Sequence, residues 1–168
     1  MLKVIEKGQG VTETEKRLIE LGDGAFIGLW SYPNVYSDEG FSKNKTGKEV
    51  CDLLVVFDNY VIIFSDKDNK FHEGIDVAVA WRRWFNKSVT ASANQLYGAE
   101  KFIRETNGRL FLDKKCTQPF PVEVNKDTRF FLVAVTNNSV APTSDFFGRF
   151  AQGSSGTLVN VFSFNLDA

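Results

Sequence analysis

The sequence predicts an α/β (α+β) fold, with a mixed central β-sheet flanked by helices, from three patterns. Two apolar runs at 51–57 and 60–66 are joined by a short polar turn, which is the outline of a β-hairpin. Residues 77–105 carry apolar side chains at intervals of three and four, in the longest helical pattern of the chain. An apolar run at 129–136 follows and is typical of a buried strand. Helices and strands in this order form a sheet covered by helices.

Length and composition fit one domain. The chain has 168 residues, of which 43% are hydrophobic, and this is enough for a core and argues against wholesale disorder. We expect a single domain over residues 1–168. Its core should cover about 11–136, and 137–168 should form an irregular segment plus a final strand.

Charge and cysteine content exclude several classes of protein. The net charge of −1 gives no overall basic field, so nucleic-acid binding would need a local basic patch. Two Cys residues and one His cannot supply a structural zinc site. The chain shows no signal peptide and no run near the roughly 20 apolar residues of a membrane span. We therefore expect a cytoplasmic protein with no membrane partner.

The first third of the chain predicts a helix, a short strand and a long loop. Residues 12–21 have capping threonines and apolar residues at helical spacing. Gly22-Asp23-Gly24 should end this helix. The apolar run at 25–30 is then expected to be a strand, and the polar stretch at 31–48 a loop.

The hairpin should bring an acid and a lysine together. A hairpin pairs the start of its first strand with the end of its second, so Asp52 and Lys67 are expected to be neighbours. Side chains alternate along a strand, which places Ser65 and Lys67 on one face and Asp66 on the other. If Asp52 shares the Lys67 face, the cluster is Asp52, Ser65 and Lys67.

The long helix at 77–105 carries a polar stripe within its apolar pattern. Ser88, Ser92 and Gln95 recur at spacings of four and three, so they lie on one side of the helix. Polar groups on a core-facing helix need partners, and a polar pocket would supply them. A solvated helix face is the alternative explanation.

The last third predicts strands at 110–112, 129–136 and 158–164, with a proline-containing loop or edge segment at 117–121. The segment 137–156, rich in Asn, Ser, Gly and Phe, has no clear assignment.

These residues resemble the restriction-endonuclease-like superfamily, also called the PD-(D/E)XK nucleases, over about 11–104. That family has a core of helix, three strands, helix and strand. It places a Glu on the first helix, an Asp early on the second strand and an acidic-x-Lys triplet on the third. Glu15, Asp52 and Ser65-Asp66-Lys67 occupy those places. Gln95 resembles a glutamine that some members place near their site.

The chain also resembles a family of uncharacterised bacterial proteins in its amino-acid sequence at 51–56 and 62–67. Those proteins are longer, which would make this chain a short member or an N-terminal domain with an additional C-terminal domain. Many nucleases of the superfamily cut as dimers, so the resemblance also implies a homodimer as one assembly.

The resemblance implies a nuclease that depends on Mg²⁺ or Mn²⁺ and hydrolyses phosphodiester bonds in DNA. Asp52 and Glu15 would hold the metal, and Lys67 would act on the nucleophile or the developing charge. Gln95 would position water or substrate, and Ser65 would be a weak ligand or a hydrogen-bonding group. Phosphates would be contacted by basic residues of the 31–48 loop and the long helix, namely Lys43, Lys45, Lys48, Arg82, Arg83 and Lys87.

Ser65 departs from the family pattern, which has an acid there. A hydroxyl is a weaker ligand for a hard cation than a carboxylate. Glu15 or Glu49 could supply the missing charge, or Asp66 could turn inward through a bulge. A third alternative is a catalytically degenerate domain that serves as a nucleic-acid- or protein-binding module. A non-nuclease interaction domain, suggested by the Phe-rich segment at 146–150, also remains open.

Overall fold

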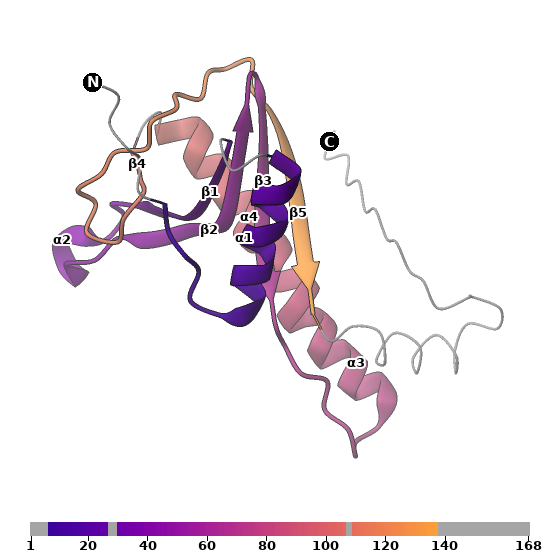
Figure 1. Ribbon diagram of the computed structural model, residues 1–168. Coiled ribbons are helices and arrows are strands. Elements are labelled where there is room, and N and C mark those ends of the chain that lie inside the picture. The colour runs from indigo at the N-terminus through magenta and orange to yellow at the C-terminus, as the bar shows by residue number, and fades with distance from the viewer. Residues whose placement is uncertain (1–6, 27–29, 107–108, 138–168) are drawn as a thin grey trace.

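The computed structural model describes residues 7–26, 30–106 and 109–137 of the chain (Figure 1). In chain order the elements are α1 (Glu13–Phe26), β1 (Ser31–Ser37), α2 (Phe41–Asn44), β2 (Lys48–Phe57), β3 (Tyr60–Lys67), α3 (Val77–Phe85), the π-helical turn η1 (Asn86–Thr90), α4 (Ala91–Thr106), β4 (Leu110–Phe111) and β5 (Arg129–Thr136).

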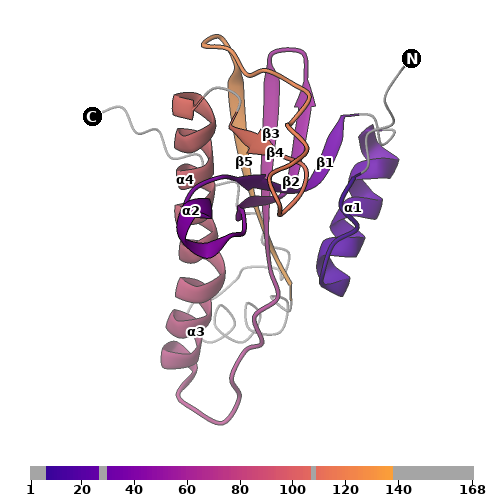
Figure 2. The ribbon, with the colours of Figure 1, turned by 90° about the vertical axis from the view of Figure 1, so that its left-hand side faces the viewer.

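The described strands form one mixed sheet in the order β4-β1-β2-β3-β5. All neighbours in this sheet are antiparallel except β3 and β5, which run parallel. Figure 2 shows α1 on one side of the sheet and α4 on the other. The predicted α/β class, a mixed sheet flanked by helices, is therefore confirmed.

Two apolar clusters hold the helices on the sheet. The larger cluster lies under α4 and includes Leu54, Ile63 and Leu96, each at most 3% exposed. The smaller cluster lies under α1, where Leu18 packs with Leu53 of β2. Adjacent residues of β2 therefore face opposite helices, which is the alternation expected of a strand covered on both sides.

The prediction for residues 25–48 was wrong. The helix α1 continues through Gly22-Asp23-Gly24 to Phe26, and the first strand is β1, at 31–37, inside the predicted loop. Gly22 is tolerated because a Cβ there would approach Leu53 Cδ2 to 3.0 Å, so the glycine lets the helix pack closely on the sheet. Tertiary packing thus overrides the local stop signal.

Strand β1 escaped prediction because it is polar and contains Pro33. Its buried polar side chains find partners nearby: the Ser31 hydroxyl donates to Asp23 Oδ1 at 3.0 Å. Asn34 Nδ2 donates to Glu49 Oε1 at 2.7 Å. These hydrogen bonds make burial of the polar groups tolerable.

The hairpin and the later elements agree with the predictions. The strands of the hairpin, predicted at 51–57 and 60–66, span 48–57 and 60–67, and β5 spans the predicted 129–136. The helix predicted at 77–105 spans 77–106 as α3, η1 and α4 in succession. Asp76 caps its start by accepting hydrogen bonds from Ala78 N and Val79 N at 3.1 Å.

Two further predictions have different outcomes. A strand does start at 110, although β4 is only two residues long. The final strand predicted at 158–164 lies outside the described residues, as does the irregular segment before it except for Asn137. Among the described helices, none is both long and apolar enough to span a membrane.

We predict that Gly47→Ala destabilises the fold. The new Cβ would lie 2.8 Å from Cys116 Sγ and 3.1 Å from the carbonyl oxygens of Lys114 and Ser37. Backbone atoms must move to relieve these contacts, so the free energy of unfolding should fall by about 1–3 kcal/mol. Chemical denaturation followed by circular dichroism measures this.

Gly98→Ala is the matched control, because a Cβ on Gly98 meets nothing within 4 Å. This glycine lies within α4, so alanine should raise the free energy of unfolding by up to about 1 kcal/mol. Equal effects of the two substitutions would contradict the packing of Gly47 against the 113–118 loop.

Candidate functional site

The candidate site lies where β2 and β3 separate. Their ladder ends at the pair Leu53–Phe64. Beyond it β2 stays paired with β1 as far as Lys48, and β3 stays paired with β5 as far as Lys67. The resulting fork opens toward the start of β2 and the end of β3.

Asp52 bridges this fork with its side chain. Its Oδ2 accepts a hydrogen bond from Asp66 N at 2.5 Å, at the point where the backbone ladder has stopped. Asp52 is 7% exposed and Ser65 is fully buried. Asp66 stays on the opposite face, where its Oδ1 accepts from Asn137 Nδ2 at 2.7 Å. The alternative that Asp66 turns inward is therefore wrong.

The polar stripe of the long helix faces this cluster. Gln95 Oε1 accepts hydrogen bonds from Lys67 Nζ at 2.8 Å and from Ser65 Oγ at 3.2 Å. Ser65 Oγ also lies 3.2 Å from Ser92 Oγ. Because Ser65 has a single hydroxyl proton, donation to Gln95 leaves Ser92 as the donor in the second bond. The prediction that this stripe meets a polar pocket is borne out, and the solvated face is not.

Ser88, the third member of the stripe, anchors the loop that follows Lys67. It is fully buried and lies in the π-helical turn. Asn69 Nδ2 donates to Ser88 Oγ at 3.2 Å, and Trp84 Nε1 donates to the Asn69 carbonyl at 3.0 Å. Trp84 and Ser88 are four residues apart and share one side of the helix, so both reach the same loop.

Burial dominates the electrostatics of Asp52. It raises the pKa of this carboxyl to about 6, against the hydrogen bond from Asp66 N and the positive charge of Lys67, which lower it. The carboxylates of Glu49 and Glu15 add smaller upward contributions to the Asp52 pKa. The ionisation of Asp52 is therefore set mainly by its burial, and the charges of Lys67, Glu49 and Glu15 act on it more weakly.

Glu15, the predicted second metal ligand, is engaged by its own helix. Its Oε2 accepts hydrogen bonds from Val11 N at 2.6 Å and Thr12 N at 3.4 Å. Thr12 Oγ1 accepts in return from Glu15 N at 3.1 Å. This is a capping box, in which the acid satisfies backbone donors at the start of the helix.

Glu49 is similarly engaged, through Asn34. Asn34 has a left-handed backbone, with φ of 48°, and lies just before an irregularity in the β1–β2 register. Sequence reasoning missed Asn34 because it lay in a predicted loop. Within residues 7–26, 30–106 and 109–137, no group of three or more acidic, His or Cys side chains lies close enough together to hold a metal.

A cavity of 510 Å³ adjoins the cluster. Gln95 belongs to the cluster and also lines the cavity, so the cluster and the cavity are adjacent. The other lining residues come from the end of β1 and the turn after it, from the start of β2 and from α4. They are Ser37, Glu39, Lys48, Glu49, Val50, Asn94, Gly98, Ala99, Lys101, Phe102 and Glu105. Both acids and lysines line it, so the cavity has mixed charge.

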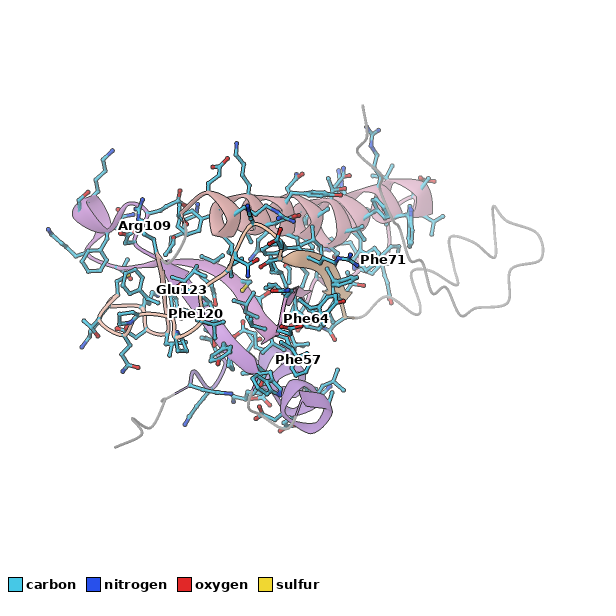
Figure 3. All side chains as sticks on the ribbon, turned by 90° about the horizontal axis from the view of Figure 1, so that it is seen from above. Phe57, Phe64, Phe71, Arg109, Phe120 and Glu123 are labelled. Atoms are coloured by element: carbon cyan, nitrogen blue, oxygen red, sulfur yellow. The ribbon has the colours of Figure 1, made fainter. Side chains whose placement is uncertain are left out.

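The six predicted phosphate-contacting residues are all exposed but do not form one patch. Lys43 lies on α2 with Lys45 just after it, whereas Arg82 and Arg83 lie on α3. Figures 1 and 3 show α2 and α3 at opposite ends of the molecule. Lys48, at the start of β2, is paired with Glu39 at 2.9 Å, and Lys87 lies in the π-helical turn.

A second, apolar cavity of 410 Å³ lies on the α1 side, at the closed end of the hairpin. Trp30, Phe57, Tyr60 and Phe131 line it and are each at least 41% exposed. Trp30 and Phe57 make an edge-to-face contact with ring centroids 5.2 Å apart. This end of the hairpin therefore carries an exposed aromatic surface.

No family model matches the chain, and neither the curated proteins nor the solved structures searched contain a match.

We predict that the stability of the protein increases as the pH falls from about 6 to about 4. The folded state binds the Asp52 proton more tightly than the unfolded chain, because burial raises the pKa of this carboxyl to about 6. Ionised Asp52 therefore costs stability above pH 6, and protonation removes that cost on the order of 2–3 kcal/mol.

The variant Asp52→Asn isolates this contribution. It should be more stable than the wild type at pH 8, and the difference should shrink toward pH 4, in denaturant titrations at each pH. Asp127→Asn, at an exposed position, should follow the wild type throughout. A constant difference between Asp52→Asn and the wild type across this range would contradict the burial of an ionisable Asp52.

Proposed function

We propose that this chain is a metal-dependent nuclease domain that hydrolyses phosphodiester bonds in DNA, with its site at the fork between β2 and β3. One observation carries the proposal. A buried carboxylate, Asp52, shares a small polar cluster with Lys67 and Gln95, although these residues come from three different elements. Clusters of this kind, with a perturbed acid, are more frequent at catalytic sites than elsewhere.

The order of the elements supports the same proposal. Apart from the short elements α2 and β4, the chain runs through a helix, three antiparallel strands, a long helix and a strand parallel to the third. This is the order that the resemblance to restriction-endonuclease-like proteins implies. Asp52 lies in the middle of β2 and Lys67 at the end of β3. This also supports the proposal, because the resemblance implies an acid on the second strand and a lysine on the third.

The donor set fits a hard divalent cation by its chemistry. Carboxylate oxygens are the ligands that Mg²⁺ and Mn²⁺ prefer, and Asp52 supplies one from a buried position. Glu15 and Glu49 are near enough to raise the Asp52 pKa, and each would have to leave a hydrogen bond to become a ligand. When bound, the cation would polarise the phosphoryl oxygen and lower the pKa of a coordinated water.

The remaining residues would position substrate and stabilise charge. Lys67 carries three donors on one ammonium, so it can keep its bond to Gln95 and donate to a phosphoryl oxygen. That donation strengthens as charge accumulates in the transition state. Gln95 borders the mixed-charge cavity and would hold Lys67 at its edge.

The alternative function is a degenerate domain of the same fold that binds nucleic acid or protein without cutting. Two observations favour it. The Ser65 hydroxyl is already used in hydrogen bonds to Gln95 and Ser92. In the part of the chain that the structure describes, the acids do not form a group ready to hold a metal.

We predict that wild-type protein cleaves DNA with Mg²⁺ or Mn²⁺, and that Asp52→Ala and Lys67→Ala each lower the rate by about 10²-fold or more. The assay follows supercoiled, linear and single-stranded DNA on gels. Removal of the cation with EDTA should abolish cleavage.

Matched controls are Lys126→Ala and Asp127→Ala, an exposed lysine and acid away from the fork. Both should cleave at the wild-type rate. Cleavage that survives Asp52→Ala and Lys67→Ala would place the site elsewhere. A wild type that neither cuts DNA nor binds Mn²⁺ by calorimetry would favour the degenerate alternative.

A further inference from the structure

Asp66 is joined to the site through its backbone and to the opposite face through its side chain. Its N–H donates to Asp52 Oδ2 at 2.5 Å. Its carboxylate points to the other side of the sheet, where Oδ1 accepts from Asn137 Nδ2 at 2.7 Å. Whatever restrains the Asp66 side chain therefore also restrains the donor that Asp52 uses.

Asn137 makes a second contact with the same strand end. Its backbone N donates to the Lys67 carbonyl at 3.0 Å, directly after the last pair of the parallel ladder, Thr136–Lys67. One residue thus holds Asp66 by its side chain and Lys67 by its main chain. Asp66 donates to Asp52 and Lys67 donates to Gln95, so both residues that Asn137 holds belong to the site.

This restraint matters because the strand end has lost its other neighbour. The β2–β3 ladder stops at Leu53–Phe64, so residues 65–67 pair only with β5 among the described strands. On the side that faces β2, the hydrogen bond from Asp66 N to the Asp52 carboxylate replaces the missing strand pairing. A strand end held from one side is free to move unless a further contact fixes it.

We infer that Asn137 and Asp66 form a positioning pair, which fixes the end of β3 so that the Asp66 N–H and the Lys67 ammonium stay directed at Asp52 and Gln95. Its meaning for catalysis rests on the nuclease function proposed above. Neither side chain touches the reacting groups. The pair acts by keeping them in register, where a displacement near 1 Å can cost as much as about 10²-fold in rate.

The test uses a reversal of the pair. Asn137→Asp sets two carboxylates against each other and should release the end of β3. Asp66→Asn combined with Asn137→Asp restores one donor and one acceptor, now in the opposite direction. Asn125→Asp is the control, because Asn125 Nδ2 bonds Asn59 Oδ1 at the other end of the same two strands.

The first readout is hydrogen exchange of the Asp66 and Lys67 amides, measured by NMR. Asn137→Asp should speed exchange of the Asp66 amide by about tenfold or more, and the double variant should return it to within about threefold of the wild type. Asn125→Asp should leave this amide unchanged.

The second readout is the steady-state kinetics of DNA cleavage. Asn137→Asp should lower kcat by about tenfold with little change in KM, and the double variant should recover kcat. The inference is overturned if the double variant fails to restore exchange, or if Asn125→Asp changes it equally. If the wild type cuts no DNA, the nuclease proposal fails, and exchange alone still decides whether the pair positions the strand.

Discussion

The structure depends on one hydrogen bond, from the Asp66 N–H to the Asp52 carboxylate, at the point where β2 and β3 part. In a hairpin whose strands stay paired to their ends, backbone hydrogen bonds would continue past this point. Here the β2–β3 ladder stops at Leu53–Phe64, and the Asp52 carboxylate accepts the hydrogen bond of the Asp66 N–H in place of a backbone carbonyl. The sheet therefore opens without leaving the Asp66 donor unpaired.

The opening would be costly if its polar groups were not satisfied by one another. Ser65, Ser92 and Gln95 form a connected set with Lys67, and the described residues contain no buried side-chain nitrogen or oxygen without a hydrogen bond. A fully satisfied network of this kind specifies one arrangement, because any slip would leave a buried group unpaired. The same helix then ties down the loop after Lys67 through Trp84 and the π-turn, so β3 is held on both sides of the lysine.

Much of this arrangement was predictable from the sequence, because it follows from the spacing of apolar and polar residues along each strand and helix. The hairpin and β5 are short apolar runs, and strand alternation puts Ser65 and Lys67 on one face. The face of Asp52 was a condition of the predicted cluster, and the structure supplies it. The inward direction of Ser92 and Gln95 follows from helical spacing.

The remainder depends on tertiary contacts that local patterns do not report. Strand β1 is polar, and its Ser31 and Asn34 side chains hydrogen-bond to Asp23 and Glu49. These partners lie 8 and 15 positions away in the sequence, so a local sequence pattern does not reveal them. Glu15 was assigned to the metal, but in the structure its carboxylate caps its own helix. The role of Asn137 depends on a parallel neighbour far along the chain, so sequence spacing carried no signal for it.

The most direct test of the fork as a cation-binding site is an NMR titration with Mn²⁺, whose paramagnetism broadens amide signals nearby. We expect broadening to begin at the amides of Asp52, Asp66 and Lys67, and Asp52→Asn should abolish it. Broadening centred elsewhere, or unchanged in Asp52→Asn, would show that the fork does not bind the cation.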